Sequence, residues 1–385
     1  MNDRILLSFP THGFRMRMGL SIQTTATQSA SHLQAEVRQW LESLGLDAQR
    51  FACVSSGAES VHVQLAPDAA IHWLADFNTL HLASAQGWNG ADDDTDLLQE
   101  ILWSLLASPS VQTFPSLQEF QSACRIRLQL VRAAQRTSMD FKTDEVDRPA
   151  EHWQYHPDTG FTLRPGKCLI EALTLATQPA SSGRQYAFSC YRATEYVVLL
   201  ALAQEARDHN PDLYARLEHQ WRTRAIMAGD FQETLLRELG SQEQPLPMHW
   251  YVPGDRVWFR NPDDASSDVY GYEGSWVVYL GGGLFTNFWQ KDRPYDIAAK
   301  CLEIYHWRDG VVRDAQGKLA MDESAVSAQV EQTRACPVRT REVLERMQRL
   351  RDPAGVYAHG GCMDASREVA RWMRPGTCDI VLPDA

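Results

Sequence analysis

The stretch YAFSCYRATEYVVLL, residues 186–200, places one cysteine where small and aromatic residues give way to a helical apolar pattern. After Cys190, apolar side chains recur at steps of three and four along one stripe, at Ala193, Tyr196, Val197, Leu200 and Ala201. This spacing predicts a helix that begins at Cys190 and continues to about Asp208.

A thiol at a helix start has two chemical advantages. It lies among backbone N–H groups that lack an intrahelical partner, near the positive end of the helix dipole. These N–H groups favour the thiolate and can also donate hydrogen bonds to an oxyanion. A catalytic Cys190 should therefore react with iodoacetamide near neutral pH faster than the other seven cysteines. The residues alone leave the alternative of a buried packing thiol open, because free cysteines are commonly buried.

The composition is that of an ordinary soluble protein, with 44% hydrophobic and 22% charged residues among 385. A net charge of −12 without a Lys/Arg cluster argues against nucleic-acid binding. Eight cysteines without Cys-x-x-Cys spacing favour free thiols in a reducing compartment. The N-terminus lacks the apolar core of a secretion signal, and no run approaches the length of a transmembrane helix. We therefore expect a cytoplasmic protein, or one exported by a route that needs no signal peptide.

No cofactor or metal is expected from the motifs. The His and Cys positions lack zinc-site spacing, and the aspartates at 92–94 lack the alternation and glycine of a calcium loop. The three glycines at 281–283 lack the lysine and hydroxyl residue of a phosphate-binding loop and predict a β-turn.

Hydrophobic periodicity divides the N-terminal part into short elements. We expect an apolar element at 5–9, a helix at 31–44, a strand within 60–67, and a linker or solvated loop at 86–96. A longer helix follows at 116–137, where Ser116 and Glu119 have the spacing of a capping box.

The rest of the chain alternates strands and helices. We expect a hairpin at 150–166, a short helix at 167–177, strands within 248–262, 275–289 and 298–310, and helices within 322–350. Near the C-terminus, Cys362 follows His359 and two glycines at an expected helix start, which makes it a second cysteine of interest.

Five blocks, in order, carry a resemblance to a known family: FPSLQEFQSACRIRLQLVRAAQRT, HWQYHPDTGFTLRPGKCLIEALTLA, YAFSC, HWYVPGDRVWFRNP and YEGSWVVYLGGGLFTNFW. Together they resemble the spore-coat-type protein-glutamine gamma-glutamyltransferases, which are calcium-independent bacterial transglutaminases. The resemblance covers residues from about 100 to 310.

This resemblance implies an α+β fold with a papain-like (NlpC/P60-like) core, in which the helix of the nucleophile packs on an antiparallel sheet. It implies a catalytic core at 100–312, an N-terminal α/β accessory region at 1–95 and a mostly helical C-terminal extension at 313–385. Cys190 would attack a glutamine side chain to form a thioester, which a lysine amine or water then resolves. The partners would be proteins that bear Gln and Lys, without nucleic acid or a membrane span.

The sequence departs from the family pattern beside the nucleophile. Ser189 and Ser275 stand at the family's two glutamate positions, and Asn287 stands at its downstream histidine. Glu273 lies two residues before Ser275, on the same strand face, and is the favoured base. An exposed loop carboxylate is the alternative interpretation of Glu273.

Several other residues are candidates for a catalytic role beside Cys190. Asn287 could orient a base, donate to an oxyanion or lie in a turn. Glu195 lies on the wrong side of the helix to assist Cys190. His249, His306 and His359 are alternative bases, or core residues.

Two other functions fit these departures. One is a glutamine deamidase or amidase that acts as a toxin-like effector. The other is a catalytically degenerate binding module on the same scaffold.

Overall fold

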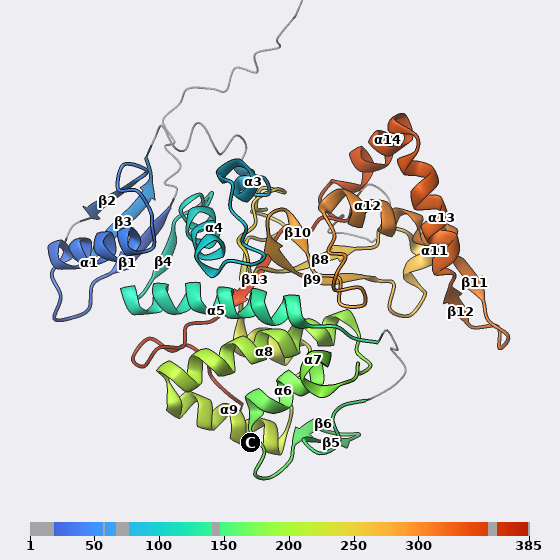
Figure 1. Cartoon of the computed structure of the whole chain (residues 1–385), viewed down its shortest axis with the longest axis horizontal. Coiled ribbons are helices and arrows are strands. Elements are labelled where there is room, and N and C mark those ends of the chain that lie inside the picture. Colours follow the sequence, from blue (N-terminus) through green and yellow to red (C-terminus); the bar gives the residue numbers. More distant parts are fainter. Residues whose placement is uncertain (1–18, 57, 67–76, 141–146, 353–359, 384–385) are drawn as a thin grey trace, which may run out of the picture.

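In the computed structural model, which describes residues 19–56, 58–66, 77–140, 147–352 and 360–383, two β-sheets lie against a layer of helices. Helix α5 (Leu117–Arg136) runs beneath both sheets and packs along helix α8 (Cys190–His209) (Figure 1). The fold is therefore mixed α+β, as the sequence predicted. Among the described residues, no helix combines the length and apolar character needed to cross a bilayer.

The N-terminal sheet has the strand order β2-β3-β1-β4. Its strands are β1 (Leu20–Gln23), β2 (Phe51–Ser56), β3 (Ser60–Leu65) and β4 (Gln112–Phe114). The flanking helices are α1 (Ala30–Ser43), α3 (Leu82–Gln86) and α4 (Asp94–Leu106). The predicted helix at 31–44 and strand within 60–67 are confirmed, and the apolar element at 5–9 lies outside the described residues.

The aspartate-rich stretch at 86–96 is in part the expected solvated loop, because residues 87–93 form neither helix nor strand and are mostly exposed, but helix α4 begins within it at Asp94. Asp93 caps helix α4, since its carboxylate accepts the N–H groups of Thr95 at 2.6 Å and Asp96 at 3.2 Å. Asp94 then pairs with Arg132 of α5 at 2.6 Å. Helix α4 was not predicted from the sequence. The ion pair between Asp94 and Arg132 attaches it to α5.

The helical layer follows the predicted periodicity. It contains α5 and α8 together with α6 (Leu169–Thr177), α7 (Pro179–Ser182) and α9 (Pro211–Thr223). The predicted hairpin at 150–166 is present as β5 (Trp153–His156) and β6 (Gly160–Leu163). Ser116 caps α5 as expected, because its hydroxyl accepts the N–H of Glu119 at 3.1 Å.

The second sheet has the order β10-β9-β8-β13-β7, and its neighbouring strands are antiparallel. Its strands are β7 (Leu236–Leu239), β8 (Arg256–Arg260), β9 (Gly274–Gly281), β10 (Leu284–Phe285) and β13 (Arg367–Ala370). Helices α10 (Gly229–Leu235) and α11 (Asp264–Ser267) precede β7 and follow β8. The strands predicted within 248–262 and 275–289 are confirmed, and so is the glycine turn, with φ of +93°, +60° and +80° at 281–283.

Two predicted elements are wrong. Residues 298–310, predicted as a strand, form helix α12 (Ile297–His306) and a 3-10 turn η2 (Trp307–Asp309). Asp296 caps α12 by accepting the N–H of Ala299 at 2.6 Å. The expected helix after Cys362 is instead strand β13, whose side chains alternate between buried and half-buried positions.

The C-terminal region begins with hairpin β11 (Val311–Arg313) and β12 (Leu319–Met321). Helices α13 (Glu323–Arg334) and α14 (Pro337–Met347) confirm the helices predicted within 322–350 and pack on α12 (Figure 1). The same region supplies β13, which lies between β8 and β7. Residues beyond 312 thus share the second sheet with the residues before them.

Candidate active site

The segment before Cys190 is held by a neighbouring stretch of chain at 138–140. The N–H of Asp140 donates to the carbonyl of Tyr186 at 3.0 Å, and the N–H of Phe188 donates back to Asp140 at 3.2 Å. The N–H of Met139 donates to the carbonyl of Phe288 at 2.8 Å. Residues 138–140 therefore join the cysteine segment to the loop after β10.

Cys190 is the first residue of α8, as the periodicity predicted. Ser189 is the N-cap, and its hydroxyl accepts the N–H of Arg192 at 3.3 Å. The sulfur of Cys190 is approached by the backbone N–H groups of Trp276 on β9 and of Tyr191. Since α8 packs against β9, the helix start and the sheet together surround the sulfur with donors.

The charge state of the thiol differs from the expectation. Burial raises the pKa of the Cys190 thiol, because only 8% of the residue is exposed. The N–H of Trp276 and the positive charge of Lys300 lower this pKa, but the net direction is upward. The helix start alone does not make Cys190 anionic, and the expected rapid alkylation of the free protein loses its basis.

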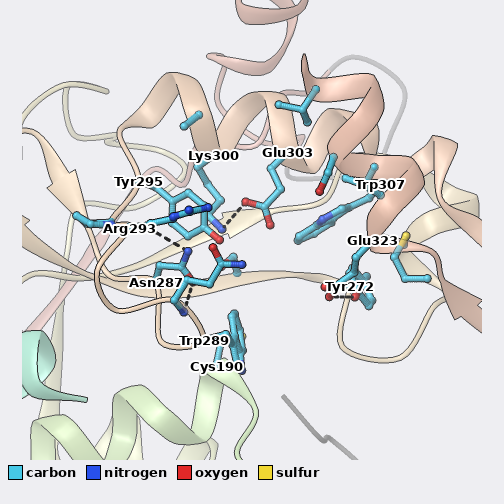
Figure 2. Close-up of a pocket in the computed structure, with 18 of the residues that line it drawn as sticks. Cys190, Tyr272, Asn287, Trp289, Arg293, Tyr295, Lys300, Glu303, Trp307 and Glu323 are labelled. Atoms are coloured by element: carbon cyan, nitrogen blue, oxygen red, sulfur yellow. Dashed lines mark hydrogen bonds and ion pairs between the residues drawn. The ribbon is translucent and has the colours of Figure 1, made fainter. Parts of the chain in front are cut away.

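Cys190 opens into a cavity of about 410 Å³. Its walls include Ser275 and Asn287, together with Trp307 of η2 and Val330 of α13. Figure 2 shows Cys190 at one end, below the side chains that come from α12. The C-terminal region therefore forms one wall of the candidate site.

Asn287 lies in this cavity wall and is 7% exposed. Its Nδ2 donates to the carbonyl of Arg293 at 3.1 Å, and its Oδ1 accepts the N–H of Gln290 at 3.2 Å. Asn287 is thus both a turn residue and a neighbour of Cys190 in one cavity. The turn interpretation is confirmed, and a catalytic role of Asn287 stays a prediction.

Glu273 occupies a different place from the one expected of a base. Its side chain is exposed, and its Oε1 accepts the N–H of Gly271 at 3.2 Å. The cavity is lined by Gly274 and Ser275 from this part of β9, and Glu273 is not among its lining residues. In this geometry Glu273 matches the exposed loop carboxylate of the alternative interpretation.

Of the three histidine candidates, the two that the structure describes do not line the cavity. His306 is buried, with Nδ1 2.6 Å from Asp309 Oδ2 and Nε2 2.7 Å from Thr333 Oγ1. His249 precedes β8, where its carbonyl accepts the N–H of Thr79 at 3.1 Å, and it does not line the cavity. His359 lies outside the described residues.

Two further candidates have structural partners. Glu195 is buried, and its Oε1 accepts the N–H of Ala228 at 2.8 Å while Arg192 pairs with its other oxygen. Cys362 is buried with its sulfur 3.4 Å from that of Cys301. Both belong to the packed interior.

The sequence patterns did not reveal the ion pair of Lys300 and Glu303, which lines the same cavity as Cys190. Lys300 Nζ lies 3.2 Å from Glu303 Oε2, and it lies 3.6 Å from the centroid of the Tyr295 ring. Lys300 and Glu303 are three residues apart on α12 and so lie on one face of that helix. Asp296 before Ile-Ala-Ala was the available signal for this helix, and its spacing could have placed both side chains together.

Within the described ranges, no group of three or more His, Cys, Asp or Glu side chains is arranged to hold a metal ion. The cavity is lined by the thiol of Cys190, the buried pair of Lys300 and Glu303, and the amides of Asn287 and Gln290, and backbone N–H groups approach the sulfur.

Comparison with known proteins identifies a family and a similar solved structure. A family model described as protein-glutamine gamma-glutamyltransferase matches residues 81–381. Among solved structures, a transglutaminase from Geobacillus stearothermophilus, without its C-terminal extension, matches with 16% identity and a TM-score of 0.39. That match covers 67% of this chain and 95% of the other. No curated protein matches the chain.

Proposed function

The chain belongs to the protein-glutamine gamma-glutamyltransferase family, and we propose that Cys190 is its nucleophile and forms a thioester with a glutamine side chain. The observation that carries this proposal is the position of Cys190. Its sulfur lies at the start of α8, in a cavity, beside the backbone N–H of Trp276.

The proposed reaction has two acyl-transfer steps. The thiol first loses its proton, and the sulfur attacks the carboxamide carbon, Cδ, of the glutamine side chain. The C–N bond then breaks, and the nitrogen takes up a proton and leaves as ammonia. A primary amine attacks the thioester, the C–S bond breaks, and the sulfur recovers the proton that the amine loses. Water in place of the amine gives deamidation.

The surroundings of Cys190 support stabilisation of the tetrahedral intermediates. The N–H groups of Trp276 and Tyr191 are backbone donors fixed by β9 and α8, so they need no rearrangement during the reaction. The side-chain amide nitrogen of Asn287 carries two N–H donors, and one of them donates to the carbonyl of Arg293. We assign the other to the substrate oxygen.

We propose Glu303 in place of Glu273 as the general base. A base must come within hydrogen-bond reach of the proton that it removes. Glu303 lines the cavity of Cys190, whereas Glu273 is exposed outside it. We therefore propose that Glu303 is the carboxylate of the site.

The arrangement of α8 against an antiparallel sheet supports the proposal of a papain-like core. For the region 1–95 we propose an accessory role in selecting substrates or docking a partner, since the cavity of Cys190 lies outside it.

The test uses the full chain and a lysine-free peptide that contains glutamine. We expect ammonia release together with covalent incorporation of an added primary amine. The variant C190A should lose at least about a thousandfold of the rate, as removal of a nucleophile commonly does. C336A, at an exposed cysteine, is the matched control and should keep the rate.

Three results would redirect the proposal. Ammonia release without amine incorporation would make the protein a glutamine deamidase. Activity in C190A would remove Cys190 from the mechanism. Absence of ammonia from every glutamine donor tried would favour the binding module, which the serines at 189 and 275 already motivate.

A further inference from the structure

The cavity wall contains a lysine that is almost wholly buried. Lys300 of α12 is 1% exposed and lies in the same cavity as Cys190. Burying an ammonium group is unfavourable unless it is paired and hydrogen-bonded. A buried lysine beside a reactive thiol therefore requires an explanation.

The surroundings of Lys300 keep it protonated. Burial pulls the pKa of Lys300 down, but the charge of Glu303 and the contact with Tyr295 more than offset this, so that the net direction is upward. Glu303 Oε2 lies 3.2 Å from Nζ, and the Tyr295 ring centroid lies 3.6 Å from it. A protonated amine has no lone pair, so Lys300 carries a fixed positive charge and cannot act as a base.

This charge reaches Cys190. The positive charge of Lys300 lowers the pKa of the Cys190 thiol, and the thiolate in turn favours the charged lysine. Figure 2 shows Lys300 and Glu303 coming from α12 above the end of the cavity that holds Cys190. Lys300 lowers the pKa of the Cys190 thiol more than Arg256 does.

The remaining charged and titratable groups around this end of the cavity are engaged with one another or exposed. On α8, Arg192 pairs with Glu195, and across the sheet Arg256 of β8 pairs with Glu368 of β13. In the cavity wall Tyr272 donates to Glu323, and Arg334 pairs with Glu331. Further groups of this kind are Tyr191, Arg293, Tyr295 and Glu303. Of these, Arg293 is exposed and its carbonyl accepts from Asn287.

We propose that Lys300, held in place by Glu303 and Tyr295, is the counter-charge of the Cys190 thiolate. The inference rests on the proposed function, in which that thiolate attacks the carboxamide and is later the leaving group of the thioester. A fixed positive charge favours the sulfur anion both when it attacks the carboxamide and when it leaves the thioester, before it recovers its proton. Lys300 acts through the sulfur and is a positioning residue.

The test measures the pH dependence of alkylation of Cys190 by iodoacetamide in the full chain, followed by peptide mass spectrometry. In K300M the midpoint of this profile should rise by about one pH unit or more, since a nearby opposite charge shifts a pKa by that amount. Alkylation near pH 7 should then be about tenfold slower. K300R should restore most of the rate, and K291M, at an exposed lysine, should match the wild type.

A midpoint in K300M within about 0.3 unit of the wild type would overturn the inference, because it is well below the shift expected of a neighbouring charge. If K300M does not fold, the double variant K300M/E303L replaces the whole ion pair by apolar side chains, a change that buried pairs commonly tolerate. It should show the same upward shift, and an unshifted midpoint would again be decisive against the proposal.

Alkylation needs no substrate, so the two proposals fail separately. A shifted midpoint without ammonia release would support the counter-charge and contradict the acyl transfer. Ammonia release that depends on Cys190, with an unshifted midpoint in K300M, would do the reverse.

Discussion

The buried carboxylate of Glu119 binds the segment that follows β13. Removing this carboxylate tests how the C-terminal segment is attached to the rest of the fold. The carboxylate is 1% exposed and accepts the N–H groups of Met373 at 2.8 Å and Arg374 at 3.0 Å, together with the hydroxyl of Thr377 at 2.5 Å. These contacts follow directly after β13, the strand that the C-terminal region adds to the second sheet. The perturbation is E119A.

The magnitude follows from the two backbone donors that the substitution leaves without an acceptor. An unsatisfied buried donor costs about 1–3 kcal/mol, and a hydrogen bond to a charged group contributes about 1.5–3 kcal/mol. We expect E119A to destabilise attachment of the segment by about 3–6 kcal/mol. E119Q keeps one acceptor oxygen and should lose about half as much.

The assay is limited trypsin cleavage after Arg371, the arginine that precedes Met373 and Arg374, whose backbone N–H groups donate to Glu119. When opening is fast relative to cleavage, the cleavage rate follows the population of the open segment. A loss of about 3 kcal/mol therefore predicts cleavage more than about a hundredfold faster in E119A. Q118A, at the exposed neighbouring residue of α5, is the control and should match the wild type. Cleavage of E119A within about threefold of the wild type would refute the reasoning, since that ratio corresponds to less than 1 kcal/mol.

Two further predictions concern carboxylates. E303Q should lower the rate of ammonia release by about a hundredfold or more, as loss of a general base does. E273Q should stay within about twofold of the wild-type rate, because Glu273 is exposed outside the cavity. A larger loss of rate in E273Q than in E303Q would show that Glu273 is the base. Glu100 is buried where its Oε1 accepts the N–H of Gly282 at 2.8 Å, and burial raises the pKa of Glu100 from 4.5 to about 7. The folded state therefore holds this proton after the unfolded chain has lost it, so the free energy of unfolding should fall by roughly 3 kcal/mol between pH 4.5 and 7 and stay level above pH 7. Urea unfolding across this range should show the slope in the wild type and a flatter profile in E100Q, and equal profiles would contradict the assignment.

The elements that the sequence predicted correctly are those fixed by neighbours along the chain. The start of α8 at Cys190 follows from an N-capping serine and a 3.6-residue apolar repeat, and both act within one or two turns. The same holds for α5 and for the hairpin around Gly160, whose φ of +73° suits glycine. The family resemblance also came from the sequence, and the match over residues 81–381 confirms it.

The errors lie where local signals compete with burial. Residues 298–310 are rich in apolar side chains that suit a strand, but the cap at Asp296 and burial of Ile297, Cys301 and Ile304 on one face make them a helix. Glu119 has capping-box spacing, yet its carboxylate binds the C-terminal segment, because that segment supplies buried donors from far along the chain.

By itself, the sequence determined the family, the nucleophile candidate and the helix on which that candidate sits, because capping and periodicity are local. Only the tertiary structure decided which groups meet the sulfur. It brought Lys300 and Glu303 into the cavity of Cys190, left Glu273 exposed and reversed the expected direction of the thiol pKa. The physical reason is that electrostatic interactions and desolvation depend on distances and burial in space, and these are set by packing between segments far apart in the chain.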